Sequence, residues 1–157
     1  MTIRGIDIAS HQSEGGMPID WEAVKDAGNE FVVIKATGGA VYKNKYYAKQ
    51  LAGARAAGLI IGHYHYAHEL SFGQPRASAA QEAAFFIANS DIREGEFAVL
   101  DIEDPDVQPG ENLATFALTW LDLVSEAIGN RAWLYTYPYY AIEHGLLDVR
   151  FLYYPLW

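Results

Sequence analysis

The sequence predicts a single α/β domain, residues 1–157, built on at least five parallel strands. Two regularities indicate this class. Short apolar runs alternate with helix-like stretches, and the runs begin 28 to 38 residues apart, which is the spacing of repeating βα units. Each run is also largely apolar on both faces, as in a parallel sheet that is covered on both sides. The chain falls short of the roughly 250 residues that a complete eight-stranded α/β barrel needs.

The strands are expected where the apolar runs lie. In chain order these runs are Ile3–Ala9, Phe31–Ala36, Leu59–Ala67, Phe97–Ile102 and Ala132–Tyr137.

Four helices are expected between the strands, each with apolar residues at helical spacing. The first, Trp21–Ala27, has Asp20 as its N-cap and Gly28 as its stop. The second follows Asn44 as its N-cap and ends at Gly58. The last two are Pro75–Asn89 and Asn112–Ile128.

Charge and composition exclude several kinds of partner and site. Acidic residues outnumber basic ones 20 to 11, and the basic residues form no stripe, so nucleic acid is not an expected partner. The lack of Cys excludes disulfides and thiolate metal sites. No apolar run approaches the roughly 20 residues of a membrane-spanning helix.

The two ends of the chain carry expectations about export and completeness. The start enters a strand-like segment without the apolar core of a signal peptide, so export would need another route. Residues 151–157 are strongly apolar, whereas chain termini are usually exposed and polar. We therefore expect either a chain that is cut inside a strand or a second chain that covers this end.

Three acids fall near the carboxyl ends of predicted strands, where parallel α/β sheets collect functional residues. Asp7 lies late in the first strand, and Asp101 and Glu103 end the fourth. Side chains two apart on a strand share a face, so Asp101 and Glu103 project together. Burial beside a second carboxylate raises the pKa of one partner and keeps it protonated near neutral pH. Glycosidic cleavage needs such a proton donor and a second group that stabilises positive charge.

Two other interpretations of these strand ends stay open. Asp101 and Glu103 could cap the following loop or bind backbone amides. Alternatively, His63 and His65 lie two apart on the third strand, and a His-x-His pair with strand-end aspartates holds zinc in several metal-dependent hydrolases. Against the zinc hypothesis, both histidines could face the helix layer while the neighbouring tyrosines face the interior.

Aromatic residues and a lysine accompany the acids. Tyr64, Tyr66, Tyr135 and Tyr137 lie near strand ends, where tyrosine rings either stack on the apolar faces of sugars or fill the core. Lys35 ends the second strand, where a buried cation would offset the acidic cluster, unless its ammonium reaches solvent.

The ordered set of these segments resembles the glycoside hydrolase family 25 muramidases, the Chalaropsis-type lysozymes of fungi, bacteria and phages. Residues 5–12 (GIDIASHQ) match the family's opening pattern of Gly, hydrophobic, Asp, hydrophobic, Ser, x and Gln. Residues 31–37, 57–66 and 134–136 resemble its second, third and fifth strands. The segment from Leu100 to Glu103 resembles its catalytic Asp-x-Glu, and the resemblance covers essentially the whole chain.

The resemblance implies a modified TIM-like (β/α) barrel that hydrolyses the β-1,4 bond between N-acetylmuramic acid and N-acetylglucosamine in peptidoglycan, at the bacterial cell wall. Glu103 would be the general acid, with Asp7 and Asp101 as supporting carboxylates. No cofactor or metal is implied, and a chain without a leader suits release as a phage lysin. The substrate-binding residues would be Tyr64, Tyr135, Lys35 and Tyr66.

The chain departs from the family pattern at two places. Gly38 follows Thr37 where the family usually has Glu, so the loop of residues 38–40 would contact substrate differently. Leu156 and Trp157 resemble the start of the family's sixth strand, after which further strands and another active-site acid normally follow. A barrel that ends there would have an exposed edge. A fragment, a chain completed by a partner, and a non-catalytic wall-binding or assembly domain are therefore alternatives to an active enzyme.

Overall fold

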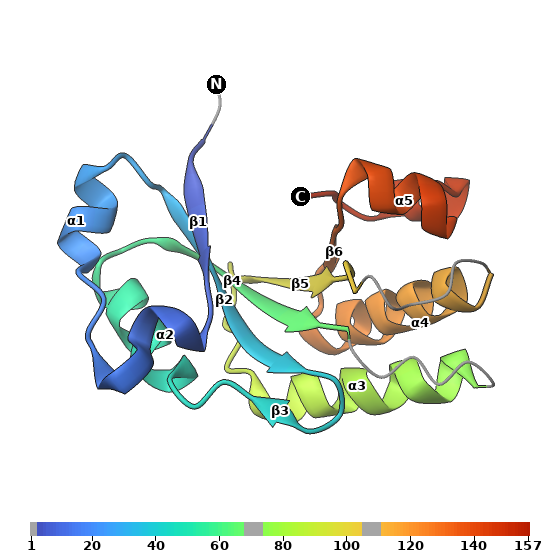
Figure 1. The fold of residues 1–157 in the computed structure, drawn as a ribbon, viewed down its shortest axis with the longest axis horizontal. Coiled ribbons are helices and arrows are strands. Elements are labelled where there is room, and N and C mark those ends of the chain that lie inside the picture. Colours follow the sequence, from blue (N-terminus) through green and yellow to red (C-terminus); the bar gives the residue numbers. More distant parts are fainter. Residues whose placement is uncertain (1–2, 68–73, 105–110) are drawn as a thin grey trace.

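The structure is a computed structural model that describes residues 3–67, 74–104 and 111–157 (Figure 1). Helices and strands alternate along the chain, as the apolar periodicity predicts. In chain order the elements are β1 (Gly5–Ile8), the 3-10 segment η1 (Ser10–Gly16), α1 (Trp21–Asp26), β2 (Phe31–Gly38), β3 (Tyr42–Lys43), α2 (Tyr47–Ala56), β4 (Ile60–Tyr66), α3 (Pro75–Asn89), β5 (Phe97–Asp101), α4 (Glu111–Ile128), β6 (Trp133–Tyr135), α5 (Pro138–His144) and the 3-10 segment η2 (Val149–Tyr153).

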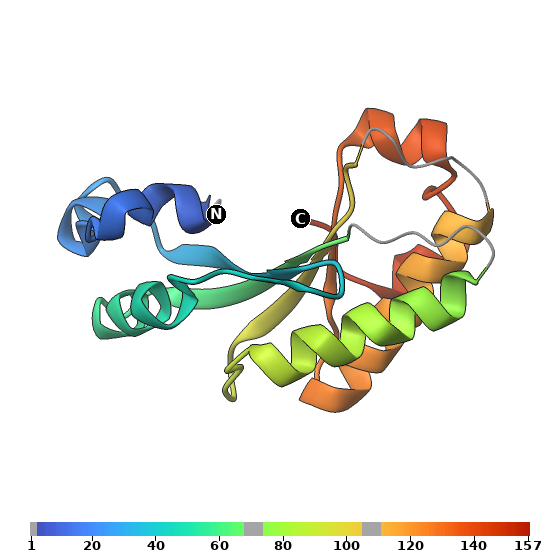
Figure 2. The ribbon, with the colours of Figure 1, turned by 60° about the horizontal axis from the view of Figure 1, so that its bottom comes forward.

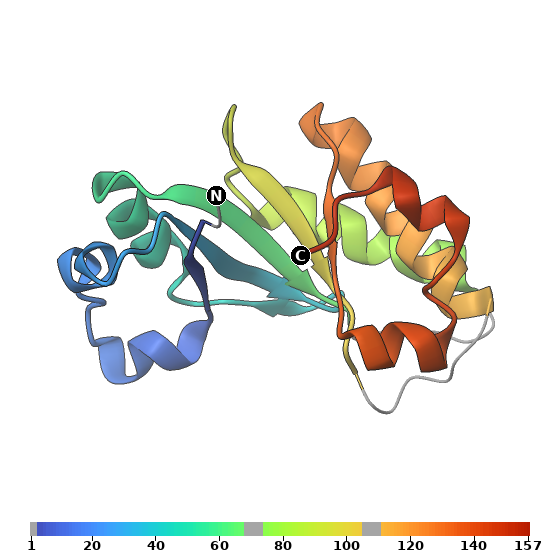
Figure 3. The same ribbon diagram turned by 90° about the horizontal axis from the view of Figure 1, so that it is seen from above.

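Five strands form a parallel sheet whose order in space is their order along the chain, β1-β2-β4-β5-β6. The short β3 pairs antiparallel with the end of β2, and a parallel bridge from Leu134 to Leu156 extends the sheet beyond β6. Within the described ranges the sheet is open between β1 and Leu156 (Figures 1 and 3). All five predicted strands and the predicted α/β class are confirmed.

Helices cover one face of the sheet, which we call the outer face. α3 and α4 pack side by side along it (Figure 2). Residues at alternate strand positions, such as Val32, Ile34 and Leu100, point into this layer and pack with Phe86 and Trp120, all of them fully buried. In the described part of the chain, no helix is long and apolar enough to cross a bilayer.

The opposite, inner face carries a separate aromatic cluster. Val33, Tyr64 and Val99 are its buried members. Gly62 lies among them. A side chain would not fit at this position, because a Cβ would lie 2.6 Å from the Phe97 ring. The partly buried members are Phe31, Tyr66, Phe97, Trp133, Tyr135 and Trp157.

The helix predictions hold with one correction and some omissions. The Asp20 side chain caps α1 by accepting from the Ala23 amide at 3.0 Å, as predicted. Asn44 is not the N-cap of α2, which begins at Tyr47 without a side-chain cap. Asn44 instead bridges the loop before α2, donating to the Lys35 carbonyl at 2.8 Å and accepting from the Tyr46 amide at 3.0 Å. β3, α5 and both 3-10 segments were not predicted from the sequence.

Candidate active site

The predicted acids share the inner face of the sheet, with Asp101 and Glu103 at the carboxyl end of β5 and Asp7 late in β1. Asp101 is the last residue of β5, and Leu100 and Ile102 on either side of it point into the outer core. Asp101 and Glu103 therefore share the inner face, as their spacing predicts. Asp7 joins them from β1, where it pairs in register with Val33, an inner-face residue.

Asp101 and Glu103 each bury one carboxylate oxygen. Asp101 is 8% exposed and Glu103 is half-buried. Oδ1 of Asp101 and Oε2 of Glu103 have no hydrogen-bond partner among the residues that the structure describes. The amides of residues 105–110, which the loop-capping interpretation concerns, lie outside the described residues. Burying a polar atom without a hydrogen bond costs free energy. Such atoms are typical of groups that act on a ligand.

Asp101 holds a proton at neutral pH. Burial, and then the negative charge of Glu103, raise the pKa of Asp101 to about 8, while Lys35 opposes the rise and Asp7 adds to it. The carboxyl pair of Asp101 and Glu103 thus carries a proton near pH 7. That is the condition under which a pair of acids can protonate a leaving oxygen.

Lys35 reaches the inner face from β2 and lies among tyrosine rings. Its ammonium nitrogen Nζ is 4.4 Å from the Tyr66 ring centroid, 5.6 Å from that of Tyr64 and 5.5 Å from that of Tyr42. Burial lowers the pKa of Lys35, while the charges of Asp101 and Glu103 raise it. Of the two roles open for Lys35, the structure favours the buried cation that offsets the acids.

Tyr135 at the end of β6 and Tyr137 just after it lie beside the acids. The Ile102 amide donates to the Tyr135 carbonyl at 3.0 Å, which holds the two strand ends together. The Tyr135 and Tyr137 rings meet edge to face with centroids 5.9 Å apart. A contact between the Tyr137 hydroxyl and Glu103 raises the pKa of Tyr137. Tyr137 was predicted only as one of four strand-end tyrosines that stack on sugars or fill the core, and its contact with Glu103 was not predicted.

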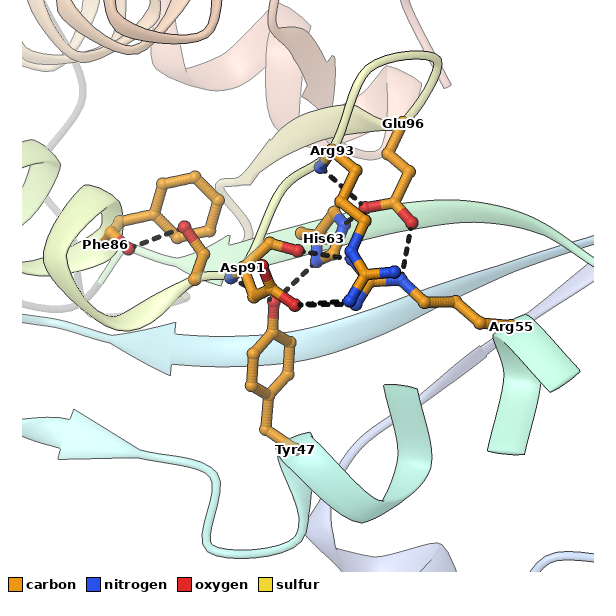
Figure 4. Close-up of polar contacts among 8 residues, drawn as sticks. Tyr47, Arg55, His63, Phe86, Asp91, Arg93 and Glu96 are labelled. Carbon is orange, nitrogen blue, oxygen red and sulfur yellow. Dashed lines mark hydrogen bonds and ion pairs between the residues drawn. The ribbon is translucent and has the colours of Figure 1, made fainter. Parts of the chain in front are cut away.

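His63 and His65 lie on the outer face, so the zinc hypothesis for this pair is wrong. Both are fully buried in the helix layer, away from the strand-end acids. The nitrogens of His63 contact the Tyr47 hydroxyl at 2.6 Å and Glu96 at 2.8 Å (Figure 4). The nitrogens of His65 contact the Thr37 hydroxyl at 2.7 Å and Glu82 at 2.7 Å. Each ring nitrogen is thus occupied by a protein group.

Both histidines are expected to stay neutral well below pH 6.5, because burial lowers the pKa of each. The unfolded chain takes up these protons near pH 6.5, so this contribution to stability is present above that pH and is lost as the pH falls. The loss is at most about 1.4 kcal/mol per pH unit for each histidine. Ring-proton NMR between pH 7.5 and 5.5 should show that the signals of His63 and His65 do not shift. Titration of His63 or His65 near pH 6.5 would contradict this.

A family model described as "Glycosyl hydrolases family 25" matches residues 6–157. The uncharacterized protein YegX of Escherichia coli K12 is 32% identical over 162 residues, which cover 99% of this chain but 55% of YegX, so the chain spans little more than half of that relative. The N,O-diacetylmuramidase of Chalaropsis sp is 30% identical over 154 residues, covering 87% of this chain and 67% of that protein.

A solved structure agrees with these matches. The bacterial lysozyme from Streptomyces coelicolor superposes with a TM-score of 0.81 at 26% identity, covering 100% of this chain and 73% of that one. The likeness confirms the predicted modified TIM-like (β/α) barrel architecture.

Proposed function

This chain belongs to family 25 of the glycosyl hydrolases, and on that premise we propose that it is an N-acetylmuramidase. Its reaction is hydrolysis of the β-1,4 bond between N-acetylmuramic acid and N-acetylglucosamine in bacterial peptidoglycan, at the cell wall. One observation carries the proposal. Asp101 and Glu103 lie together at the end of β5, each with a buried oxygen that no described residue satisfies, and Asp101 keeps its proton at neutral pH.

The residues around this pair support a reaction at a sugar. The rings of Tyr64, Tyr66 and Tyr135 line the inner face beside the acids, and aromatic rings of this kind stack on the apolar faces of sugars. Lys35 limits the repulsion between the acids and keeps part of the cluster ionised. A site that combines a retained proton with a nearby negative charge suits a reaction in which positive charge develops at the sugar.

We assign the roles as the family resemblance implies, and the greater exposure of Glu103 supports this assignment. Glu103, the more exposed of the pair, passes the proton that the two carboxyl groups share to the glycosidic oxygen as the bond from that oxygen to the sugar carbon breaks. In a substrate-assisted route, the oxygen of the N-acetyl group attacks the same carbon, and Asp101 with Asp7 orients that group and stabilises the charge. Water then opens the intermediate and its proton returns to Glu103, so the carboxyl group is regenerated.

The test is the chemical identity of the new sugar ends. Purified peptidoglycan is digested, the released fragments are reduced with borohydride, and their masses are determined. Reduced N-acetylmuramic acid ends are expected. Reduced N-acetylglucosamine ends would assign cleavage to the other bond of the glycan strand. Binding to the wall without any new ends would instead favour a non-catalytic wall-binding domain.

A further inference from the structure

The two outer-face histidines sit in matching networks. In each, a carboxylate contacts Nε2 and a hydroxyl group contacts Nδ1. A carboxylate only accepts hydrogen bonds, so Nε2 of the neutral ring carries the proton and Nδ1 accepts from the hydroxyl. The network of His63 joins Tyr47 and Glu96 to Arg55 and Asp91 (Figure 4). The network of His65 is smaller, and its members Thr37, His65 and Glu82 are all 0% exposed.

The His65 network coincides with an irregularity in β2. Lys35 pairs with Tyr64 and Thr37 pairs with His65, so Ala36 is an extra residue, as in a β-bulge. In a regular strand, Thr37 would share the inner face with Lys35 and lie opposite Tyr66. The bulge turns Thr37 to the outer face, where its hydroxyl reaches Nδ1 of His65 at 2.7 Å. This hydrogen bond therefore exists only in the bulged register.

The bulge decides what lies beside Lys35 on the inner face. It places Gly38, which has no side chain, opposite Tyr66. A Cβ at Gly38 would already touch the Tyr66 carbonyl oxygen at 3.4 Å and the Tyr42 ring at 3.6 Å. A threonine at the position of Gly38 would place further atoms beyond this Cβ, beside Tyr66 and Tyr42. The bulged register thus leaves room for the Tyr66 ring, whose centroid lies 4.4 Å from the Lys35 ammonium nitrogen.

The other partners of His65 come from the helix layer. Glu82 comes from α3, and the Trp120 ring from α4 stacks on the imidazole with centroids 5.5 Å apart and planes at 21°. The Phe86 ring meets the imidazole edge on at 5.8 Å. Contacts from α3 and α4 therefore hold the imidazole of His65 on β4, whose Nδ1 accepts the hydrogen bond from Thr37.

We propose that Thr37, His65 and Glu82 form a clamp behind the active site that holds the β2 bulge and thereby positions the Lys35 ammonium beside Asp101 and Glu103. The clamp residues touch no substrate, so they are positioning residues that act through Lys35. The inference rests on the proposed muramidase function for its kinetic test, but the position of Lys35 can be measured without turnover.

The kinetic test is a double-mutant cycle in the full chain. Thr37→Val keeps the shape of the side chain and removes the hydroxyl, and it is expected to lower kcat about tenfold, since small displacements of catalytic groups cost up to about a hundredfold. Lys35→Met is expected to lower kcat as well. In the Lys35→Met background, Thr37→Val should cause little further loss, because coupled sites are not additive. Thr37→Ser, which restores the hydroxyl, should return kcat toward that of the parent.

Tyr47→Phe is the matched control, because it removes the hydroxyl from Nδ1 of His63, which has no bulge beside it. It is expected to destabilise the chain while leaving kcat and the pH–rate profile unchanged. Thr37→Ala replaces Thr37→Val if the latter does not fold. Additive losses in the cycle, or an equal loss of kcat from Tyr47→Phe, would overturn the clamp.

A second readout separates this inference from the proposed function. NMR follows the methylene signals of Lys35 next to its ammonium as the pH is raised, in the parent, Thr37→Val and Tyr47→Phe proteins. A displaced titration in Thr37→Val alone supports the clamp even if the parent releases no fragments, in which case the muramidase proposal fails by itself. Identical titration in all three proteins overturns the clamp even if the parent is active.

Discussion

The Glu103→Gln variant is expected to lose about 10²–10⁴-fold in kcat on peptidoglycan, the contribution typical of a general acid. Glutamine has nearly the same shape but cannot release a proton to the leaving oxygen. Because Oε2 of Glu103 has no partner among the described residues, the substitution breaks no hydrogen bond at that atom. Folding and KM should therefore change little. The measurement is the rate at which new reducing ends appear from purified peptidoglycan.

The control for this variant is Glu126→Gln, which makes the same chemical change at an exposed position on α4. It should keep the parent rate. If Glu103→Gln retains more than about a tenth of the parent kcat, Glu103 is not the general acid, and the protonated Asp101 takes its place in the mechanism. Circular dichroism of all three proteins separates a chemical effect from loss of folding.

The sequence predicted the strands and the acid pair because both depend on local periodicity. Apolar runs of strand length mark β1, β2, β4, β5 and β6, and the alternation of side chains along β5 is sufficient to place Asp101 beside Glu103. Asp7 could be added because parallel strands end at the same edge of a sheet. None of these steps requires knowledge of which residues far apart in the sequence meet.

Several parts that the sequence did not predict depend on such distant contacts. The spacing of His63 and His65 is compatible with either face, and the choice is made by Glu96 and Glu82, which come from other elements. The bulge at Ala36 is visible only once β2 is paired with β4. The raised pKa of Asp101 depends on burial and on Lys35, neither of which a sequence motif specifies.

The Asp101→Asn variant is expected to be less active but more stable at alkaline pH than the parent. The pKa of Asp101 is about 8 in the folded chain, against about 3.9 for an unfolded chain. Between these values the folded state holds a proton that the unfolded state releases. The stability that this proton contributes is fully present below about pH 4 and is lost as the pH rises toward 8. Above pH 8 the parent must keep a buried charge beside Glu103, whereas the amide stays neutral.

Removing the carboxyl group should therefore flatten the decline of stability with pH, by at most about 1.4 kcal/mol per pH unit between pH 4 and 8. Urea unfolding at pH 5, 7 and 9 measures this slope for the parent and for Asp101→Asn. Asp148→Asn is the matched control, since hydrogen bonds from Arg150 lower the pKa of Asp148 and no alkaline gain is expected there. Equal slopes in the parent and Asp101→Asn would mean that Asp101 is already ionised at neutral pH. The proton assigned to the carboxyl pair would then have to be carried by Glu103 alone.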